Sequence, residues 1–367
     1  MMWFKLERNL LEELIERVVP VIPSRTPYPI IQNILCSTEH GKLSFLATDL
    51  DIYVKTWTVL KAKEESKILL PGRKLLGIVK ESNADEMEFT REENKIIVKA
   101  GRSVFKMPIL DAEEFPRMFE LPQETRFSVD GKDLRRIFEA VEFAVSKGED
   151  RPAMTGIYWE LKNERNRMVA TDGHRMAVSE DKNSVPKIEE RSQILPTKIF
   201  NFFPKEIDGP IDVSMDNTKI GLSFNSTEVV SRLIEGPYPD YEKVIPKEIK
   251  NVLTVSREEF TSALRRMMIF TNQVTRQIKL VLGKKTLEIS SFSPEGEEAH
   301  EELTASYKGE SFEVAYNGSY LLDIMRHIET EDVVFDITGA LSAALIHGSG
   351  TKDEQVRFYL LMPILLD

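Results

Sequence analysis

The phrase Asp172-Gly173-His174-Arg175 has the residue types of an acid–base site. An Asp two residues from a His can orient an imidazole for proton transfer. Residues two apart on an extended segment share a face, however, so a structural hydrogen bond is the commoner result of this spacing. The sequence carries no Gly-x-Ser-x-Gly nucleophile motif beside the pair. We therefore predict no catalytic residues, and we keep an enzyme with a site around Asp172, His174 and Arg175 as an alternative.

Metal and nucleotide chemistry find no support in the sequence. The five histidines are scattered without metal-ligand spacing, and they are His40, His174, His300, His327 and His347. A phosphate-binding P-loop and a Gly-x-Gly-x-x-Gly phrase are both absent from the sequence. We predict that the protein uses no metal and no cofactor.

Composition narrows the class of protein. The chain has 367 residues and a formal net charge of −11, which argues against a simple basic nucleic-acid binder. The single cysteine, Cys36, rules out an internal disulfide framework and fits a reducing compartment. The N-terminus does not read as a signal peptide, and no stretch reaches the roughly 18 apolar residues of a membrane span. We predict a soluble cytoplasmic protein with no membrane partner.

The Asp172 phrase belongs to an internal repeat. Ala170-Thr171-Asp172 follows Ala47-Thr48-Asp49 by 123 residues (170 − 47), and Ser291 occupies the corresponding place 121 residues later (291 − 170). Searching for such self-similarity first is necessary, because a missed repeat changes the whole fold prediction. Three units of this length fill the chain.

Each unit has the same predicted order of elements: strand, amphipathic helix, strands, second helix and closing strands. Apolar residues at spacings of three and four predict the first helices, as in Leu11, Leu14, Ile15 and Val18. The second helices are predicted to begin at Pro71, Pro196 and Asn317. The strands predicted after the first helices include 31–36, 42–47, 156–160, 278–282 and 286–290.

These patterns predict an α+β fold made of three tandem domains, each with two helices on an antiparallel sheet. The predicted boundaries are 1–123, 124–248 and 249–367. Three such domains in a row could form an arc. Two arcs with complementary ends could then close into a head-to-tail dimeric ring, because a heterologous contact gives a ring when its rotation closes.

Four phrases carry a resemblance to a known family, and they are Ala47-Thr48-Asp49, Ala170-Thr171-Asp172-Gly173-His174-Arg175, Tyr238-Pro239-Asp240-Tyr241 and Tyr359-Leu360-Leu361-Met362-Pro363. At these separations they resemble the bacterial DNA sliding clamps, the beta subunits of replicative DNA polymerase, over the whole chain. The resemblance implies the DNA clamp fold and a ring of two three-domain protomers around duplex DNA. It also implies a processivity factor that tethers the polymerase and other clients and that an external clamp loader opens.

The resemblance further implies a hydrophobic pocket for short client peptides, made from the second domain and the C-terminal tail. By matched position its residues are Met154, Thr171, Gly173, His174, Arg175, Met176, Pro239, Lys243, Val244, Leu360, Leu361, Met362, Pro363, Ile364 and Leu365. Flexible Met and Leu walls suit varied side chains. The tail itself is nearly all apolar, and Pro363 cannot continue a central ladder, which favours a binding role beyond a core strand. The family usually has a basic residue where this chain has Leu365.

For DNA, basic residues recur on the predicted helices of all three units, which predicts a basic bore inside an acidic ring. Contacts would go to phosphates without reading bases, so a ring could slide. By matched position the residues that approach DNA are Arg25, Arg73, Gly148, Arg151, Pro152 and Ala153. The family often has aromatic residues where this chain has Pro152 and Ala153.

The two ends of the chain carry complementary features for ring closure. In the first unit, Phe105 lies on an edge-like strand, 102–107, beside Arg102. In the third unit, Ile269 and Phe270 end the first helix, and Glu298 and Glu301 belong to an acidic run. An apolar plug flanked by opposite charges predicts a homodimer interface. Ordinary core packing of Phe105 with a solvated acidic loop is the alternative.

The sequence leaves three functions to separate: a DNA sliding clamp, an enzyme, and a peptide-binding scaffold without DNA encirclement. The repeat favours the clamp over the enzyme, because an enzyme rarely needs three equivalent domains. The charge of the bore separates the clamp from the scaffold.

Overall fold

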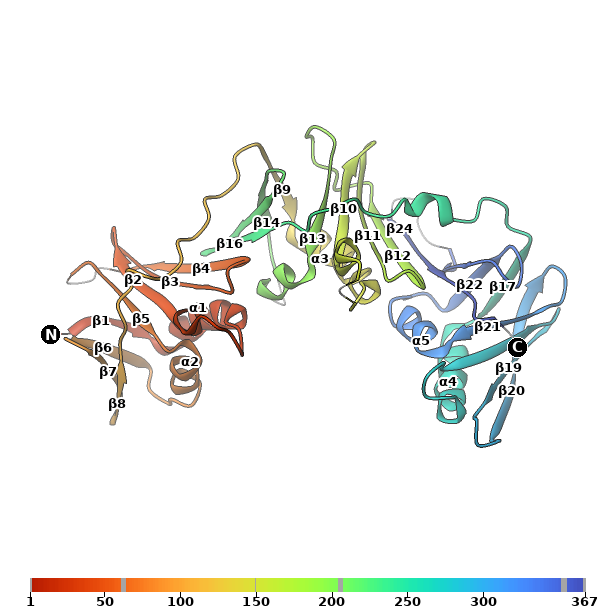
Figure 1. Cartoon of the computed structure of the whole chain (residues 1–367), viewed down its shortest axis with the longest axis horizontal. Helices are drawn as coiled ribbons and strands as arrows, with labels where there is room; N and C mark the ends of the chain where they lie inside the picture. Colours follow the sequence, from red (N-terminus) through yellow and green to blue (C-terminus); the bar gives the residue numbers. More distant parts are fainter. Residues whose placement is uncertain (1, 61–63, 149, 204–206, 351–354, 366–367) are drawn as a thin grey trace. The chain divides into compact units, whose positions relative to one another are not determined.

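The computed structural model describes residues 2–60, 64–148, 150–203, 207–350 and 355–365. The chain forms two compact units, one made of Met1–Lys132 with Pro196–Leu233 and the other of Asp133–Leu195 with Ile234–Asp367. The middle third of the sequence is thus shared between the units (Figure 1). Among the described residues, no helix has the length and apolar character that crossing a membrane requires.

Each α-helix begins where a strand has just ended. The helices of the described residues are α1 (Arg8–Val18), α2 (Gly72–Lys80), α3 (Gly131–Glu139), α4 (Arg257–Met267) and α5 (Gly318–Arg326). The apolar stripe predicted for the first of them is buried, because Leu11, Leu14, Ile15 and Val18 are at most 2% exposed. Full burial of each such side chain contributes about 1.5–3 kcal/mol.

The starts of α4 and α5 are capped by the side chains that precede them. Ser256 Oγ accepts a hydrogen bond from the Glu259 amide at 3.4 Å at the start of α4. Asn317 Oδ1 accepts from the amides of Ser319 and Tyr320 at 2.9 and 3.3 Å at the start of α5. Such bonds satisfy amides that have no partner inside the helix.

The first unit contains two antiparallel sheets. Their strands are β1 (Met2–Glu7), β2 (Ile34–Glu39), β3 (Lys42–Thr48), β4 (Ile52–Val59), β5 (Ser66–Leu70), β6 (Glu86–Glu92), β7 (Lys95–Ala100), β8 (Ser103–Pro108), β9 (Thr125–Asp130), β14 (Pro210–Met215), β15 (Lys219–Phe224) and β16 (Thr227–Arg232). One sheet has the order β1-β6-β7-β8 and the other the order β5-β2-β3-β4-β16-β15-β14-β9. The pairing of β4 with β16 therefore joins the first third of the chain to the middle third (Figure 1).

The second unit contains one sheet of 12 strands among the described residues. They are β10 (Gly156–Lys162), β11 (Arg165–Thr171), β12 (Arg175–Asp181), β13 (Arg191–Pro196), β17 (Asn251–Ser256), β18 (Gln277–Leu282), β19 (Thr286–Phe292), β20 (Glu298–Lys308), β21 (Glu313–Asn317), β22 (Asp332–Ile337), β23 (Ala344–Gly348) and β24 (Gln355–Leu361). Its order is β13-β10-β11-β12-β24-β23-β22-β17-β20-β19-β18-β21, and the pairing of β12 with β24 joins the middle third to the last third. The predicted α+β class with antiparallel sheets is confirmed.

Three predicted elements differ in the structure. The strand predicted from Ile31 begins at Ile34, because the preceding residues Pro29–Gln32 form a 3-10 helix. The second helix of the middle third is a 3-10 helix, Thr197–Phe202, instead of an α-helix. Pro204 follows two residues later in the sequence, and a proline disfavours an α-helical residue before it and removes an amide. Ile269 and Phe270 lie in a 3-10 turn after α4, which ends at Met267.

Candidate functional site

A tight turn links β11 to β12 and contains the Asp–His pair. Asp172 Oδ1 accepts hydrogen bonds from the backbone amides of His174 and Arg175, both at 2.9 Å. Gly173 has φ of +89°, a left-handed conformation that glycine adopts without steric cost. Asp172 therefore binds the backbone amide of His174. His174 is an exposed residue. This geometry is that of a turn-forming Asp.

Thr171 and Met154 hold this turn in place. The Thr171 hydroxyl donates to the Arg175 carbonyl at 2.7 Å and accepts from the Gly173 amide at 3.1 Å. Met154 belongs to a 3-10 helix, Pro152–Thr155, and is 3% exposed. The Met154 Cε lies 3.6 Å from the point where a residue with a side chain at position 173 would have its Cβ. Met154 therefore packs directly against the turn.

The pairing of β12 with β24 brings the predicted residues of the tail beside those of the turn. Met176 lies opposite Leu360 in this antiparallel register. The Met362 amide donates to the His174 carbonyl at 2.9 Å, one residue after β24 ends. The main chain alone therefore assembles this part of the predicted client pocket.

Beneath these residues lies an apolar cluster on one face of β10, β11, β12 and β24. Its buried members are Val169, Met176, Val178, Tyr241, Ala343 and Leu360, and its half-buried members are Tyr158, Tyr238, Ile245, Leu345 and Phe358. Two exposed apolar residues are neighbours of cluster residues along the chain: Val244, 56% exposed, precedes Ile245, and Met362, 46% exposed, follows Leu360 by two residues. Leu365, 73% exposed, lies three residues further along the tail. We call the cluster and these three residues the client surface, after the client pocket that was predicted from the sequence.

The tail leaves β24 and continues along another strand. Leu361 is 1% exposed and ends β24 as a core residue. After Pro363, the Ile364 amide donates to the Ala315 carbonyl of β21 at 2.8 Å. The alternation of buried Leu361 with exposed Met362 and Leu365 shows that the tail is only partly core.

The segment from Tyr238 to Val244 contributes aromatic rings to the client surface. The rings of Tyr238 and Tyr158 stack with centroids 4.8 Å apart, and the Tyr238 hydroxyl donates to the Val169 carbonyl at 3.3 Å. Of the other predicted residues here, Pro239, Lys243 and Val244 are exposed. Lys243 forms an ion pair with Asp240 at 2.7 Å, so its charge is partly compensated.

A buried charged network anchors the same segment. Glu160, Arg167 and Glu180 lie opposite one another on β10, β11 and β12, and each is at most 8% exposed. Arg167 forms an ion pair with Glu180 at 2.5 Å and donates to the Tyr241 hydroxyl at 3.1 Å. The Tyr241 hydroxyl in turn donates to Glu160. Burial, together with this bond to Glu160, raises the pKa of Tyr241, so the phenol stays protonated as a donor.

Arg175 lies at the edge of the client surface but points away from it, toward α5. It is 8% exposed. Its guanidinium bonds to Asp172 at 3.1 Å, to Asp323 of α5 at 2.7 Å and to the Phe143 carbonyl at 2.7 Å. The guanidinium also lies over the Tyr320 ring, 4.3 Å from its centroid. The structure brings Arg175 to the edge of this region, and the hydrogen bonds of its side chain are made within the protein.

Several residues of this site were not predicted from the sequence. Tyr158, Val178 and Phe358 complete the floor, and Asp323 and Tyr320 hold Arg175. Short continuous apolar runs, 157–159 in β10 and 176–178 in β12, are a signal for the floor. No local pattern indicates Asp323, because it lies 148 residues from Arg175 in the sequence.

The residues predicted to approach DNA lie on both units. In the first unit, Arg25 is exposed, and Arg73 at the start of α2 donates to the Ile22 carbonyl at 2.6 Å. In the second unit, Gly148, Arg151 and Pro152 are exposed, and Ala153 is half-buried.

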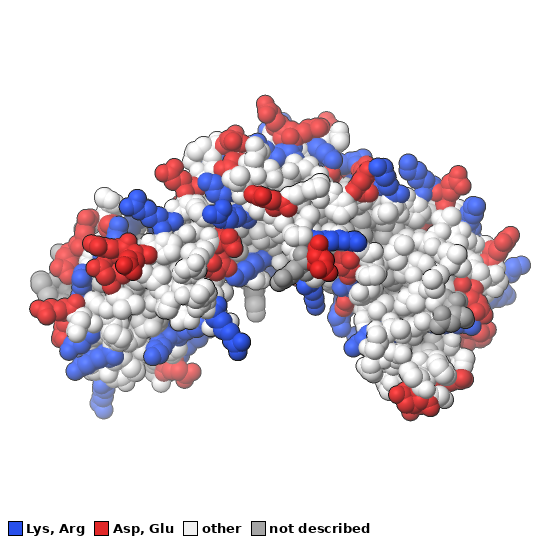
Figure 2. Space-filling model, viewed as in Figure 1, with Lys and Arg blue, Asp and Glu red and all other residues white. Residues whose placement is uncertain are grey.

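Most of the basic residues on the helices have acidic partners. Arg8 pairs with Glu12 at 2.6 Å, Lys80 with Glu16 at 2.6 Å and Arg326 with Asp323 at 2.8 Å. Lys and Arg alternate with Asp and Glu over the face drawn in Figure 2. Among the helices, α2 differs by containing basic residues and no acidic residue.

The residues predicted at the homodimer interface in the first unit lie at a sheet edge. β8 is the last strand of its sheet, and half-buried Phe105 lies on it. Phe105 and Arg102 line a cavity of about 740 Å³, together with Ile78 of α2.

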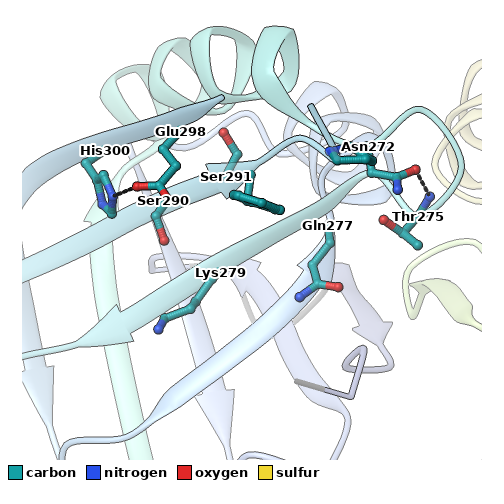
Figure 3. A pocket seen from close by; sticks show the side chains of 10 residues that line it. Asn272, Thr275, Gln277, Lys279, Ser290, Ser291, Glu298 and His300 are labelled. Atoms are coloured by element: carbon teal, nitrogen blue, oxygen red, sulfur yellow. Dashed lines mark hydrogen bonds and ion pairs between the residues drawn. The ribbon is translucent and has the colours of Figure 1, made fainter. Parts of the chain in front are cut away.

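The corresponding residues of the second unit lie around the start of β20. Ile269 is 72% exposed in the turn after α4. Glu301 accepts hydrogen bonds from Arg266, which hold the pKa of this carboxyl below its usual range. Glu298 belongs to a neighbouring pocket of about 490 Å³ (Figure 3). Polar side chains from β18, β19 and β20 line this pocket, including Lys279, Ser290 and His300 (Figure 3).

Comparison with known proteins identifies the family. The family models described as DNA polymerase III beta subunit match in chain order: the N-terminal domain at residues 2–119, the central domain at 128–240 and the C-terminal domain at 242–364. The beta sliding clamp of Pseudomonas aeruginosa is 33% identical over 100% of both chains.

Solved structures agree with this match. A sliding clamp from Pseudomonas aeruginosa bound to griselimycin is 33% identical and has a TM-score of 0.93, with 100% of both chains covered. A sliding clamp from Bartonella birtlesii, also bound to griselimycin, is 29% identical and has a TM-score of 0.94 over 100% of both chains. The resemblance and the three-repeat clamp fold predicted from the sequence are confirmed, and the chain belongs to the bacterial beta sliding clamp family.

Proposed function

We propose that this chain is a DNA sliding clamp and processivity factor whose client surface tethers the replicative polymerase and other clients. The observation that carries the client role is the exposure of Val244, Met362 and Leu365 beside a buried apolar cluster. A contiguous exposed apolar patch with a polar rim marks an interaction surface in soluble proteins. A mobile methionine side chain among them suits clients with different side chains.

The clamp acts as a ring of two copies, closed head to tail. The free edge of β8 on one copy pairs with the free edge of β20 on the other, because residues 298–304 of β20 pair with β19 alone among the described strands. Unpaired edges are templates for strand addition. The exposed Ile269 enters the cavity beside Phe105, and Arg102 and Glu298 add charge complementarity at the rim.

The ring encircles duplex DNA and contacts it loosely. Many helix cations are already in intramolecular ion pairs, so few remain to neutralise phosphates. Since salt dependence scales with the number of phosphates neutralised, a shallow dependence on salt is expected. The main cationic contacts come from Arg73 and Lys74 on α2. Arg25 adds a third cation, because it follows Ile22 by three residues and the Ile22 carbonyl accepts a hydrogen bond from Arg73. Arg151, Gly148, Pro152 and Ala153 approach the DNA from the second unit.

The clamp itself carries out no reaction. The family to which the chain belongs supports this proposal, and so does the Asp172 carboxylate, which accepts two backbone hydrogen bonds as a turn former. A clamp loader therefore supplies the energy for opening the ring. The protein works in the cytoplasm, where the replication machinery of a bacterium lies, and its partners are a second copy, DNA and client proteins.

Griselimycin is bound in solved structures of two relatives, and we propose that it occupies the client surface of this chain, so its binding tests this surface. We expect calorimetry to give one site per protomer, and Val244→Glu to abolish binding by placing a charge on the surface. Val59→Glu is the matched control. Val59 is also an exposed valine (80%), but it lies at the end of β4 in the other unit. Binding that Val244→Glu leaves intact would contradict the assignment of this surface.

A further inference from the structure

Arg175 is placed where a client-binding cation would be expected, yet each of its three nitrogens donates a hydrogen bond within the protein. Its Nε bonds to Asp172, its Nη1 to Asp323 and its Nη2 to the Phe143 carbonyl, at 3.1, 2.7 and 2.7 Å. The guanidinium lies between the rings of Phe143 and Tyr320. Three of its five N–H donors are used in these bonds, and at 8% exposure the side chain offers little surface to a client.

Two of these contacts come from α5, which belongs to the last third of the sequence. Tyr320 and Asp323 are three residues apart and therefore share one face of the helix. The side chain of Asn317 caps the start of α5, which fixes the first turn from which Tyr320 extends. The helix thus presents a ring and a carboxylate to Arg175 as one rigid unit.

The carboxylate of Asp323 accepts hydrogen bonds from two arginines, one buried and one exposed. Its Oδ2 accepts from buried Arg175 at 2.7 Å, and its Oδ1 accepts from Arg326 at 2.8 Å. The Arg326 side chain is 65% exposed, so this second pair is screened by water. The bond to Arg175 is shielded from water and is the stronger restraint.

Arg175 in turn controls the position of the turn and the tail. Its side chain and backbone amide both bond to Asp172, which also holds the His174 amide. The His174 carbonyl accepts from the Met362 amide at 2.9 Å. A continuous set of bonds therefore runs from α5 through Arg175 to the first exposed residue of the tail.

We propose that Asp323 is a positioning residue of the client surface: by holding Arg175 away from the client, it fixes the 172–175 turn and Met362. This proposal rests on the client role inferred above. In the wild-type protein Arg175 is a structural tie between β12 and α5, and clients bind the apolar side chains that this tie places.

Asp323→Asn tests the proposal, because it keeps the shape of the side chain and removes the charge that balances Arg175. We expect griselimycin affinity to fall about tenfold, since a charge-assisted hydrogen bond becomes a neutral one. Asp323→Glu restores a carboxylate and should recover part of that loss. Arg326→Gln is the matched control, because it breaks the other ion pair of the same carboxylate and should leave affinity within about twofold.

Hydrogen exchange gives a second readout that needs no ligand. In Asp323→Asn the amides of residues 173–175 and Met362 should exchange at least about tenfold faster, while those in Arg326→Gln should not change. Equal effects of Asp323→Asn and Arg326→Gln on affinity and exchange would indicate general loosening of α5 and would overturn the proposal. Unchanged affinity and exchange in Asp323→Asn would overturn it as well. Failure of the wild-type protein to bind griselimycin would contradict the client surface, and exchange alone would then decide the role of Asp323.

Discussion

The junction of β4 with β16 and the junction of β12 with β24 are built on the same turn, yet only one leaves an apolar patch exposed. In the first junction Asp49 Oδ1 accepts from the amides of Asp51 and Ile52, at 3.2 and 2.8 Å. In the second junction Asp172 Oδ1 accepts from the corresponding amides, both at 2.9 Å. The residue between has φ of +86° at Leu50 and +89° at Gly173.

At each turn, the strand of the other third of the chain leads into the same backbone hydrogen bond to the turn. The Arg232 amide donates to the Asp51 carbonyl at 3.0 Å, and the Met362 amide donates to the His174 carbonyl at 2.9 Å. Arg232 and Met362 therefore occupy equivalent places. Because the main chains match, the repeat supplies two equivalent surfaces, and the side chains decide whether each surface is covered.

The first surface is closed by its own chain. The Phe119 ring packs on the Tyr53 ring with centroids 4.7 Å apart, and the Arg232 guanidinium lies 4.9 Å from the centroid of Phe119. At the second surface, Met362 stands in place of Arg232 and is 46% exposed. The comparison indicates that a client surface arises where the covering side chains of the repeat are absent.

Exchanging the two equivalent residues should give the largest effect. We expect Met362→Arg to weaken griselimycin binding by at least about 30-fold, because it removes a central apolar contact and adds a charge. Arg232→Met makes the reverse change at the closed surface and should leave binding unchanged. Calorimetry on both variants measures this, and equal affinity for the two would refute the comparison.

The next effect concerns the segment from Tyr238 to Val244, which forms part of the second surface. Tyr241→Phe keeps the ring but removes the hydroxyl between Arg167 and Glu160. Two buried charged groups then lose a partner, so unfolding free energy should fall by about 1–3 kcal/mol. Guanidinium denaturation measures this. Tyr238→Phe, which loses only a 3.3 Å bond to a backbone carbonyl, serves as the control and should cost less.

The left-handed residue of each turn gives opposite predictions. Leu50→Gly should stabilise the protein by about 1 kcal/mol, because relief of a strained φ exceeds the added chain entropy of glycine. Gly173→Ala should destabilise it by about 1 kcal/mol, because alanine at φ of +89° is strained. Thermal unfolding of both variants checks the signs, and a shift in the same direction for both would contradict the account of the shared turn.

The smallest effect is expected from the cation beside the first turn. Lys198 pairs with Asp49, and its side chain is 43% exposed. Lys198→Met should change unfolding free energy by less than about 1 kcal/mol, because water screens an exposed ion pair. A loss of several kcal/mol in denaturation would show that this exposed pair contributes as much as the buried contacts of Arg175.

The repeat, the first helices and both Asp turns were predictable because they depend on residues close in sequence. Apolar spacing placed α1 and α4, and Ser256 and Asn317 cap the helices that they precede. The predicted α-helix after Pro196 was wrong, because the apolar spacing gave no weight to Pro204.

Candidate residues of the site could be named from the sequence, but the directions in which their side chains point could not. The resemblance implied that Arg175 belongs to the client pocket, whereas its bond to Asp323 depends on how the last third packs. The domain boundaries and the individual roles of the site residues stay predictions. The direction of the Arg175 side chain and its bond to Asp323 depend on long-range packing, which no local sequence pattern encodes.

Retention on DNA tests the central claim most directly. The protein is loaded by its clamp loader onto nicked circular duplex, and bound protein is measured before and after the circle is cut once. We predict a dimer that stays on the circle in high salt and is released when the DNA becomes linear, because a ring is held by topology and not by phosphate contacts. Retention that is the same on circular and linear DNA, or a monomer in sedimentation at all concentrations, would contradict the sliding clamp and favour a peptide-binding scaffold.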